Sequence, residues 1–209
     1  MLSLEAYLND PCGTLSIPYW KNKGILLPPD MRIVHENSFD GVMLEDFTDT
    51  PYFRLLHTLE DIDTAIPAHI LVKTATEADI PVIVDVINGS YEDLAVSLEQ
   101  VRSFRSHPTY DSDLWILAVD RARGAVAGCG IGEFDEEAGE GVLEWIQVLP
   151  AYRGRGIGRL IVNQLLSRMR FRAKFATVSG QIRNRTKPER LYRKCGFSGE
   201  DVWHILRRR

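Results

Sequence analysis

The sequence predicts a mixed α/β fold in which a mostly antiparallel sheet is flanked by helices, with an irregular extension in front of it. From residue 70 onward, strand-like and helix-like segments are mixed, and three antiparallel strands precede a strand–helix–strand unit. The 209 residues are 44% hydrophobic and 26% charged, which is typical of one globular domain with an extension. Because no repeat and no run of about 18 apolar residues occurs, a solenoid or a membrane-spanning helix is not expected.

Residues 1–68 are expected to form an extension packed on the main domain, and residues 69–209 the main domain itself. Six prolines interrupt the extension, and its apolar residues are scattered. Two short helices are predicted there. One covers Leu4 to Leu8, and the other follows Thr50, with Thr50 as its cap and Pro51 at its first position.

The first half of the main domain is predicted to contain a short strand, two helices and three antiparallel strands. The strand covers residues 70–73, and the helices run from about 76 to 88 and from about 94 to 105. The three strands cover residues 114–119, 125–134 and 141–149. The glycine-rich run 128–132 lies inside a strand, where it indicates a bulge or close packing.

The second half of the main domain is predicted to alternate between helices and strands. An amphipathic helix covers about 156–172, and a strand covers 175–179. Thr186 and Glu189 have the spacing of a capping box, and the helix that they open ends at Cys195-Gly196. A last strand is expected over 202–206.

The net charge of −4 is unevenly distributed along the chain. Residues 150–209 carry 16 basic and 3 acidic side chains, whereas residues 70–149 carry 5 basic and 15 acidic ones. This asymmetry favours an anion bound by the last third and a cation attracted by the rest, although opposite charges that meet across the fold would give the same composition.

The segment 153–158, Arg-Gly-Arg-Gly-Ile-Gly, lies between a strand and an amphipathic helix. Alternating glycines let backbone N–H groups converge on an anion, and the N-terminus of a helix adds its partial positive charge. Arg153, Arg155 and Arg159 supply full charges, so a phosphate-bearing ligand is expected. The P-loop and GxGxxG patterns both fail here, whereas the pattern [Q/R]xxGx[G/A] is filled.

This segment resembles the cofactor loop of the GNAT superfamily of acetyl-CoA-dependent N-acetyltransferases. The segment 191–197, Leu-Tyr-Arg-Lys-Cys-Gly-Phe, is similar to the family's LYxKxGF ending, and the order of elements from residue 70 also matches. The resemblance covers residues 70–209. It implies a GNAT-like sheet that is splayed at the cofactor strand, and direct transfer of an acetyl group from acetyl-CoA to a primary amine.

The resemblance also implies which residues bind acetyl-CoA. The pyrophosphate would lie on the glycine loop, and the pantetheine arm would pair with the backbone of the strand over 141–149. The implied contacts are Ile146, Gln147, Val148, Arg153, Gly154, Arg155, Gly156, Ile157, Gly158, Arg159 and Asn184. Family members often carry asparagine at the position that is Arg185 in this chain, and Asn184 lies one residue before it. Arg183, Arg185 and Lys187 could equally hold a CoA phosphate.

Transfer to an amine needs a base, because an amine with a pKa of about 10 is mostly protonated at neutral pH. Glu144 is the candidate base, since a strand period of two puts it on one face with Val142, Ile146 and Val148, at a position resembling one where family members carry a base. A salt bridge is the alternative role for this carboxylate. Glu140, Glu133 or a water chain could replace it as the base.

The departing CoA sulfur benefits from a proton donor, and a backbone N–H can stabilise the oxyanion. Tyr192 is the candidate acid because it matches the family tyrosine on the last helix. A tyrosine of the core is the alternative. The acidic residues Glu92, Asp93, Asp111 and Asp113 would suit a cationic acceptor, which is a small-molecule or peptide amine.

Several functions are not expected. The five histidines lack ligand spacing and the three cysteines lie far apart, so no metal site is expected. Cys195 is read as a small buried hydrophobe. Because the N-terminus is unlike a secretory signal, the chain is expected to be cytoplasmic, without a membrane partner.

Three further hypotheses stay open or are disfavoured. A nucleic-acid partner is disfavoured, because the basic residues lack interleaved aromatics and the whole chain is acidic. A catalytically silent CoA-binding regulatory or interaction module stays open. A homodimer is compatible with the sequence.

Overall fold

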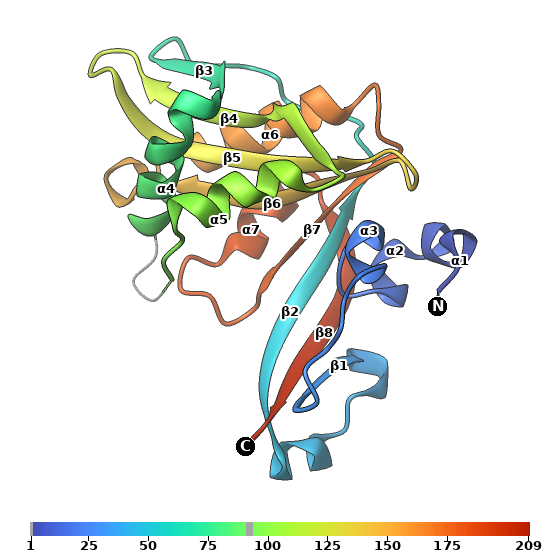
Figure 1. Ribbon diagram of the computed structural model, residues 1–209. Coiled ribbons are helices and arrows are strands. Elements are labelled where there is room, and N and C mark those ends of the chain that lie inside the picture. The colour runs from blue at the N-terminus through green and yellow to red at the C-terminus, as the bar shows by residue number, and fades with distance from the viewer. Residues whose placement is uncertain (1, 91–93) are drawn as a thin grey trace. The chain divides into compact units, whose positions relative to one another are not determined.

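The computed structural model describes residues 2–90 and 94–209, which belong to two compact units (Figure 1). Unit 1 comprises Met1–Thr58 and Thr177–Arg209, and unit 2 comprises Leu59–Ala176. The chain returns from unit 2 to unit 1 within strand β7 (Phe175–Gln181). Both units mix helices with mostly antiparallel strands, which confirms the predicted fold class. The expected division into domains at residues 68 and 69 stays a prediction.

Unit 2 is built on four strands in the order β6-β5-β4-β3, and each neighbouring pair is antiparallel. The strands are β3 (Ile70–Thr74), β4 (Tyr110–Asp120), β5 (Ala125–Asp135) and β6 (Glu140–Val148). The helices are α4 (Ile80–Asn88), α5 (Leu98–Ser103) and α6 (Ile157–Met169), with 3-10 turns η3 (Glu77–Asp79), η4 (Phe104–Ser106) and η5 (Pro150–Tyr152). This is the predicted order, although the second helix begins four residues later than expected, because Ser97 and Gln100 cap it.

Glycines on one face of β5 let helix α6 pack at close range. A β-carbon at Gly130 would lie 2.5 Å from the Cγ2 atom of Ile161, and one at Gly132 would lie 2.8 Å from the Cε atom of Met169. A larger side chain at either position would require the neighbouring side chain or the helix to shift. The close packing expected for the run 128–132 is confirmed.

The residues that alternate with these glycines belong to a different part of the core. Cys129 and Ile131 pack in one cluster with Ile83 and Ile87 of α4. Because successive residues of a strand point to opposite faces, helices α6 and α4 cover the two faces of β5. This arrangement buries the centre of unit 2.

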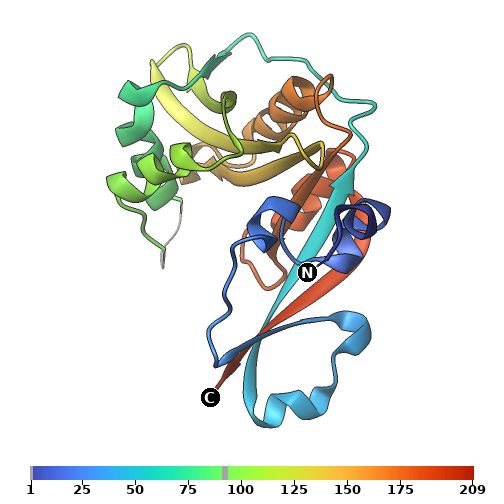
Figure 2. The same cartoon turned by 45° about the vertical axis from the view of Figure 1, so that its right-hand side comes forward.

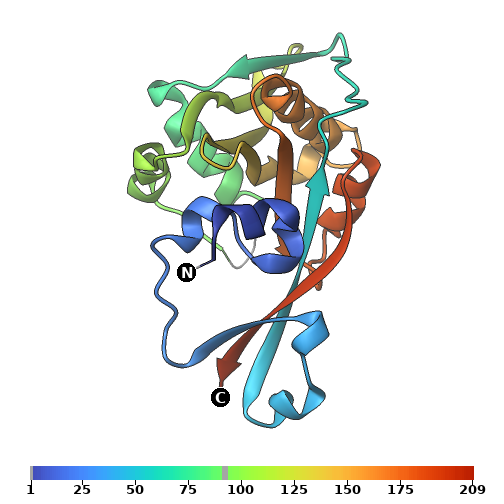
Figure 3. The same ribbon diagram turned by 90° about the vertical axis from the view of Figure 1, so that its right-hand side faces the viewer.

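Unit 1 contains strands in the order β1-β8-β2-β7 (Figures 2 and 3). Strand β8 (Ser198–Arg208) is antiparallel to both β1 (Met31–His35) and β2 (Phe47–His57). The other elements are α1 (Leu4–Asn9), α2 (Pro11–Thr14), α3 (Tyr19–Asn22), α7 (Pro188–Lys194), η1 (Glu36–Ser38) and η2 (Gly41–Glu45). The extension therefore supplies the strands on both sides of β8.

The predicted helix after Thr50 is wrong, because this segment lies inside β2. Thr50 pairs with Ile205, and Pro51 pairs with His204. A capping residue followed by proline favours the start of a helix locally. Here the hydrogen bonds and packing gained by pairing with β8 stabilise the strand instead. The helix predicted over Leu4 to Leu8 is confirmed, with Ser3 as its cap.

Arg54 of β2 is the central polar side chain of unit 1 and is only 1% exposed. Its guanidinium donates hydrogen bonds to the hydroxyl of Tyr7 at 2.9 Å and to the Oγ atom of Ser179 at 3.1 Å. It also donates to the carbonyl of Pro11 at 3.4 Å. One buried cation thus links the first two helices to β2 and β7.

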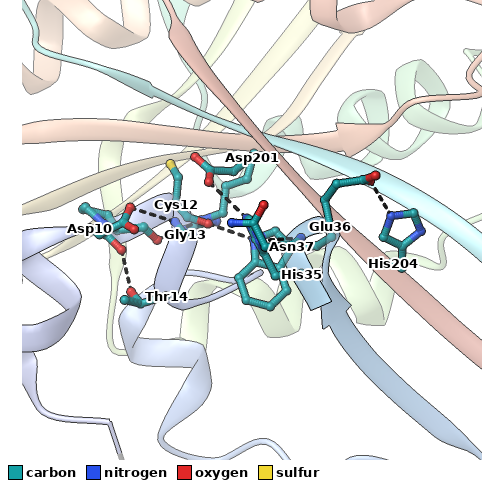
Figure 4. A network of polar contacts seen from close by, with 12 residues as sticks. Asp10, Cys12, Gly13, Thr14, His35, Glu36, Asn37, Asp201 and His204 are labelled. Atoms are coloured by element: carbon teal, nitrogen blue, oxygen red, sulfur yellow. Dashed lines mark hydrogen bonds and ion pairs between the residues drawn. The ribbon is translucent and has the colours of Figure 1, made fainter. Parts of the chain in front are cut away.

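A second polar network joins the extension to β8 (Figure 4). The Nε2 atom of His35 lies 3.1 Å from a carboxylate oxygen of Asp201, and its Nδ1 atom accepts the N–H of Asn37. Since Nδ1 accepts, the ring proton is on Nε2. His204 lies between carboxylates of Glu36 at 2.7 Å and Asp49 at 3.0 Å. These contacts fix the register between β1, β8 and β2.

Within residues 2–90 and 94–209, no helix has the length and apolar character that a membrane span requires.

We expect Arg54→Met to destabilise the protein by about 3 kcal/mol or more, because it removes a buried cation and leaves several buried acceptors without a donor. Urea unfolding measures this change. Arg32→Met is the matched control, since Arg32 is exposed on β1, and it should change the free energy of unfolding by less than about 1 kcal/mol. Equal effects of the two substitutions would contradict the role of Arg54.

Candidate active site

The glycine loop at the start of α6 has the backbone conformation that its sequence predicts. Gly154 and Gly156 have φ values of +75° and +81°, which side chains with a β-carbon rarely adopt. A β-carbon at either position would point into open space, with no atom within 4 Å. The two glycines are therefore required by backbone conformation and leave room beside the loop.

The N-terminus of α6 presents its first N–H groups to this room. Gly156 is the N-cap, and no side chain in the described part of the chain caps the helix. The first intrahelical bond runs from the N–H of Leu160 to the carbonyl of Gly156, so the N–H groups of residues 157–159 precede the ladder. These groups and the helix dipole can bind an anion such as a pyrophosphate.

The three arginines of the loop have different surroundings. Arg153 donates hydrogen bonds to the carbonyls of Val148 at 3.2 Å and Ser90 at 2.8 Å, so it holds the loop against the end of β6. Arg155 lies over the ring of Tyr152. Arg159 forms an exposed ion pair with Asp63 at 3.4 Å. Arg155 and Arg159 can turn toward a bound phosphate at little cost, because exposed contacts of this kind are weak.

Glu144 is the extra residue of a β-bulge in β6. Ile131 of β5 pairs with Trp145 and Gly132 pairs with Leu143, so Glu144 has no residue opposite it. Bulges of this kind re-aim side chains and are frequent next to active sites. The half-buried carboxylate of Glu144 thus lies at a special position of the strand.

The same bulge corrects the prediction that Val142, Glu144, Ile146 and Val148 share one face. Ile146 and Val148 pair with Gly130 and Gly128, whereas Val142 pairs with Glu133. Paired residues share a face, so Val142 lies on the other face from Ile146 and Val148. The expected common face of these residues is wrong, because the bulge adds one residue and reverses the alternation.

The other residues of β6 have the following positions. Gln147 is buried and pairs with Cys129. Ile146 and Val148 are half-buried, and the carbonyl of Val148 accepts the hydrogen bond from Arg153. Glu140 is fully buried, and Glu133 is 4% exposed and lies 3.0 Å from the Nδ1 atom of His107. Of the three carboxylates considered as a base, Glu144 is the most exposed.

Tyr192 lies on α7, in unit 1, and is 7% exposed. Its ring centroid is 5.7 Å from that of Phe197 and 6.1 Å from that of Phe53. The helix ends at Lys194 with Cys195 as its C-cap, and Gly196 follows with a φ of +95°, which confirms the expected glycine stop. The ring is held between two aromatic side chains, as either a positioned acid or a core tyrosine would be.

The expected capping box before α7 is wrong. The helix begins at Pro188, and Lys187 precedes it with a φ of +50°. The Oδ1 atom of Asn184 accepts hydrogen bonds from the backbone N–H and the hydroxyl of Thr186, which draws Thr186 into a turn. Proline at the first helical position also disfavours helical φ and ψ at the residue before it. Asn184 therefore has a structural role in this turn.

Two residues of unit 1 were missed from the sequence. Arg54 carries a weak signal, because it interrupts an apolar run, whereas His57 carries none. His57 is 3% exposed, and its Nε2 atom lies 2.9 Å from the carbonyl oxygen of Cys195. Burial lowers the pKa of His57 and outweighs the opposite effect of this hydrogen bond.

The cysteines and acidic residues complete the description of the site. Burial raises the pKa of the Cys129 thiol to about 12, so this thiol is a poor nucleophile at neutral pH. Asp111 forms an ion pair with Arg172, and the carbonyl of Asp113 accepts a hydrogen bond from Arg168. Glu92 and Asp93 lie outside the described residues. Among the described residues, no group of three or more His, Cys, Asp or Glu could hold a metal ion.

Comparison with known proteins shows what this fold and part of this sequence are similar to. Residues 111–199 match the family model of the acetyltransferase (GNAT) domain. This part of the chain contains the bulged strand, the glycine loop and α7. This region of the chain is therefore similar to a GNAT acetyltransferase domain, which is a domain of acyltransferases. No curated protein sequence matches this chain significantly.

Solved structures share the fold at low sequence identity. The GCN5-related N-acetyltransferase from Sphaerobacter thermophilus is 20% identical with a TM-score of 0.72, over 90% of this chain and 63% of that chain. The GCN5-related N-acetyltransferase from Kribbella flavida is 15% identical with a TM-score of 0.59, over 85% and 67%. Ard1 from Thermoplasma volcanium is 14% identical with a TM-score of 0.55, over 68% and 98%. The chain thus spans less than two thirds of the Sphaerobacter protein.

Replacement of Gly156 by valine should lower the affinity for acetyl-CoA at least about tenfold. A β-carbon at this φ costs about 1–2 kcal/mol and takes up the room in front of the N–H groups. Titration calorimetry measures the affinity. Gly124→Val is the matched control, since Gly124 has a φ of +62° and open space around it but lies in the turn between β4 and β5. Loss of affinity in both variants would show a general effect of strain.

The low pKa of His57 predicts a specific dependence of stability on pH. The unfolded chain binds this proton near pH 6.5, whereas the folded protein binds it only at lower pH. The stability linked to neutral His57 is therefore present above about pH 6.5 and is lost as the pH falls through the folded-state pKa. Urea unfolding of His57→Gln should depend less on pH in this range. An unchanged dependence would contradict the assignment.

Proposed function

We propose that this protein transfers the acetyl group of acetyl-CoA directly to a primary amine. The observation that carries the proposal is the open glycine loop at the N-terminus of α6, where uncapped N–H groups and two positive φ values leave room for a pyrophosphate. Arg155 and Arg159 lie beside this loop and would neutralise phosphate charge. A metal is not part of the proposal.

The amine must lose a proton before its lone pair can attack the thioester carbonyl. We assign this proton to the carboxylate of Glu144, directly or through water. Its place in the bulge supports the assignment, and Glu133 and Glu140 are weaker candidates because both are buried. The new C–N bond forms as the oxygen gains negative charge, and a backbone N–H of β6 would stabilise that charge.

The carbon–sulfur bond then breaks, and the CoA sulfur leaves with the electron pair. We assign Tyr192 as the acid that protonates it. A phenol with an ordinary pKa of about 10 carries its proton at neutral pH and can donate it to a thiolate. The products are an acetylated amine and free CoA thiol. No covalent enzyme intermediate is needed, in agreement with the weak nucleophilicity of Cys129.

Titration calorimetry with acetyl-CoA, followed by an assay of CoA thiol release with a panel of primary amines, tests the function. The panel should contain polyamines, aminoglycosides and peptides with a free N-terminus. Binding followed by acetylation of one class would support the proposal. Binding without acetylation of any amine would favour the catalytically silent CoA-binding module, and no binding would overturn both.

We expect Tyr192→Phe to lower turnover by about 100-fold or more, because general acids contribute on this scale. The affinity for acetyl-CoA should change little, since the ring and its contacts with Phe53 and Phe197 are kept. Steady-state kinetics and calorimetry measure the two quantities. Tyr110→Phe is the control. Tyr110 lies in β4 of unit 2 rather than in α7, and its hydroxyl accepts a hydrogen bond from Arg105. Unchanged turnover in Tyr192→Phe would exclude the acid role.

Replacement of Glu144 by glutamine should lower turnover by a similar factor at neutral pH and less at high pH, where more amine is unprotonated. Glu133→Gln and Glu140→Gln test the two weaker candidates by the same pH profile. If either of them slows turnover more than Glu144→Gln does, the base has been assigned to the wrong carboxylate.

A further inference from the structure

We infer that His57, which comes from strand β2 of the N-terminal extension, is a positioning residue for Tyr192 and acts through the C-terminal end of α7. The inference rests on the proposed function, because it takes Tyr192 as the acid. It goes beyond that function by giving the extension a part in catalysis.

The first observation is the hydrogen bond between His57 and the end of α7. The Nε2 atom of His57 lies 2.9 Å from the carbonyl oxygen of Cys195, which is the C-cap of α7. A carbonyl only accepts, so the ring proton is on Nε2 and the ring donates. The N–H of Cys195 in turn donates to the carbonyls of Leu191 and Tyr192. The contact thus caps the turn that contains Tyr192.

The second observation is the space left for this histidine. Gly196 has a φ of +95°, and a β-carbon there would lie 2.7 Å from the Nε2 atom of His57. Any larger residue at position 196 would displace the imidazole from Cys195. The glycine stop of α7 and the approach of His57 therefore depend on each other.

The third observation is a row of rings from β2 to Tyr192. The ring of Phe197 contacts His57 edge-on at 5.1 Å and Tyr192 edge-on at 5.7 Å, and Phe53 lies on another side of Tyr192. Phe53 and His57 are four residues apart on one strand and share a face. Strand β2 therefore contacts both the tyrosine ring and the end of its helix.

Helix α7 depends on such contacts because it is short. Seven residues do not form a stable helix on their own in water. A second contact comes from β8, where a bulge lies opposite residues 54–56 of β2 and Arg193 donates to the carbonyl of Gly199 at 2.9 Å. Without His57, the carbonyl of Cys195 loses this donor from β2, and the last turn of α7 holds the tyrosine hydroxyl less firmly in one direction.

The test combines amide hydrogen exchange with a double-mutant cycle. In His57→Leu we expect faster exchange at the amides of residues 195–197 and a loss of turnover of about 10-fold to 100-fold, with the KM for acetyl-CoA nearly unchanged. His57→Gln, which keeps an N–H donor, should recover part of both. The double variant His57→Leu/Tyr192→Phe should be no slower than Tyr192→Phe alone, because a positioning residue has no effect once the acid is removed.

His35→Leu is the matched control, since His35 lies in the same unit and bonds to Asp201 rather than to α7. It should leave the exchange of residues 195–197 and the turnover unchanged. If His57→Leu does not fold, His57→Asn replaces it, because its shorter side chain does not reach Cys195.

Unchanged exchange at residues 195–197 would overturn the inference, and so would a double variant that is slower by the product of the single effects. Failure of the proposed function looks different. It appears in the parent protein, as absent acetylation, or in Tyr192→Phe, as undiminished turnover, before His57 is changed.

Discussion

The close approach of helix α6 to strand β5 is the constraint on which the candidate site depends. Gly130 and Gly132 present only backbone to the helix at their two positions, and Ile161 and Met169 fill the space where side chains would otherwise stand. The N-terminus of α6 is thereby held at the end of β6, directly after the strand that contains Glu144. Close packing in unit 2 thus sets the direction of the N–H groups that would bind a pyrophosphate.

Unit 1 uses a different physical principle, because polar contacts join its parts. The buried guanidinium of Arg54 binds groups from two helices and a strand, and the pair formed by His35 and Asp201 fixes the edge strand to β8. Buried polar groups of this kind are costly unless every one is paired, so they specify one arrangement of the chain. The extension is therefore integrated into unit 1 through β8 and α7.

The sequence predicted best what is encoded by neighbouring residues. The glycine loop, the glycine-rich run 128–132 and the end of α7 at Gly196 each depend on local conformation, and the structure has them as expected. The segment after Thr50 was misassigned, because its strand partner lies about 150 residues away. The common face expected for Val142, Ile146 and Val148 is wrong because one inserted residue reverses the alternation of a strand, and no local pattern marks it. His57 was missed because it meets Cys195, which is 138 positions away.

The position of β8 between β1 and β2 has a consequence for the order of folding during synthesis. Strands β1 and β2 leave the ribosome long before β8 is made. Until then, the edge of each strand that pairs with β8 has no partner. Unit 2, whose strands pair with near neighbours in sequence, can fold in the meantime. We therefore expect nascent chains that end before residue 198 to contain a folded unit 2 and an extension that is accessible to proteases and chaperones.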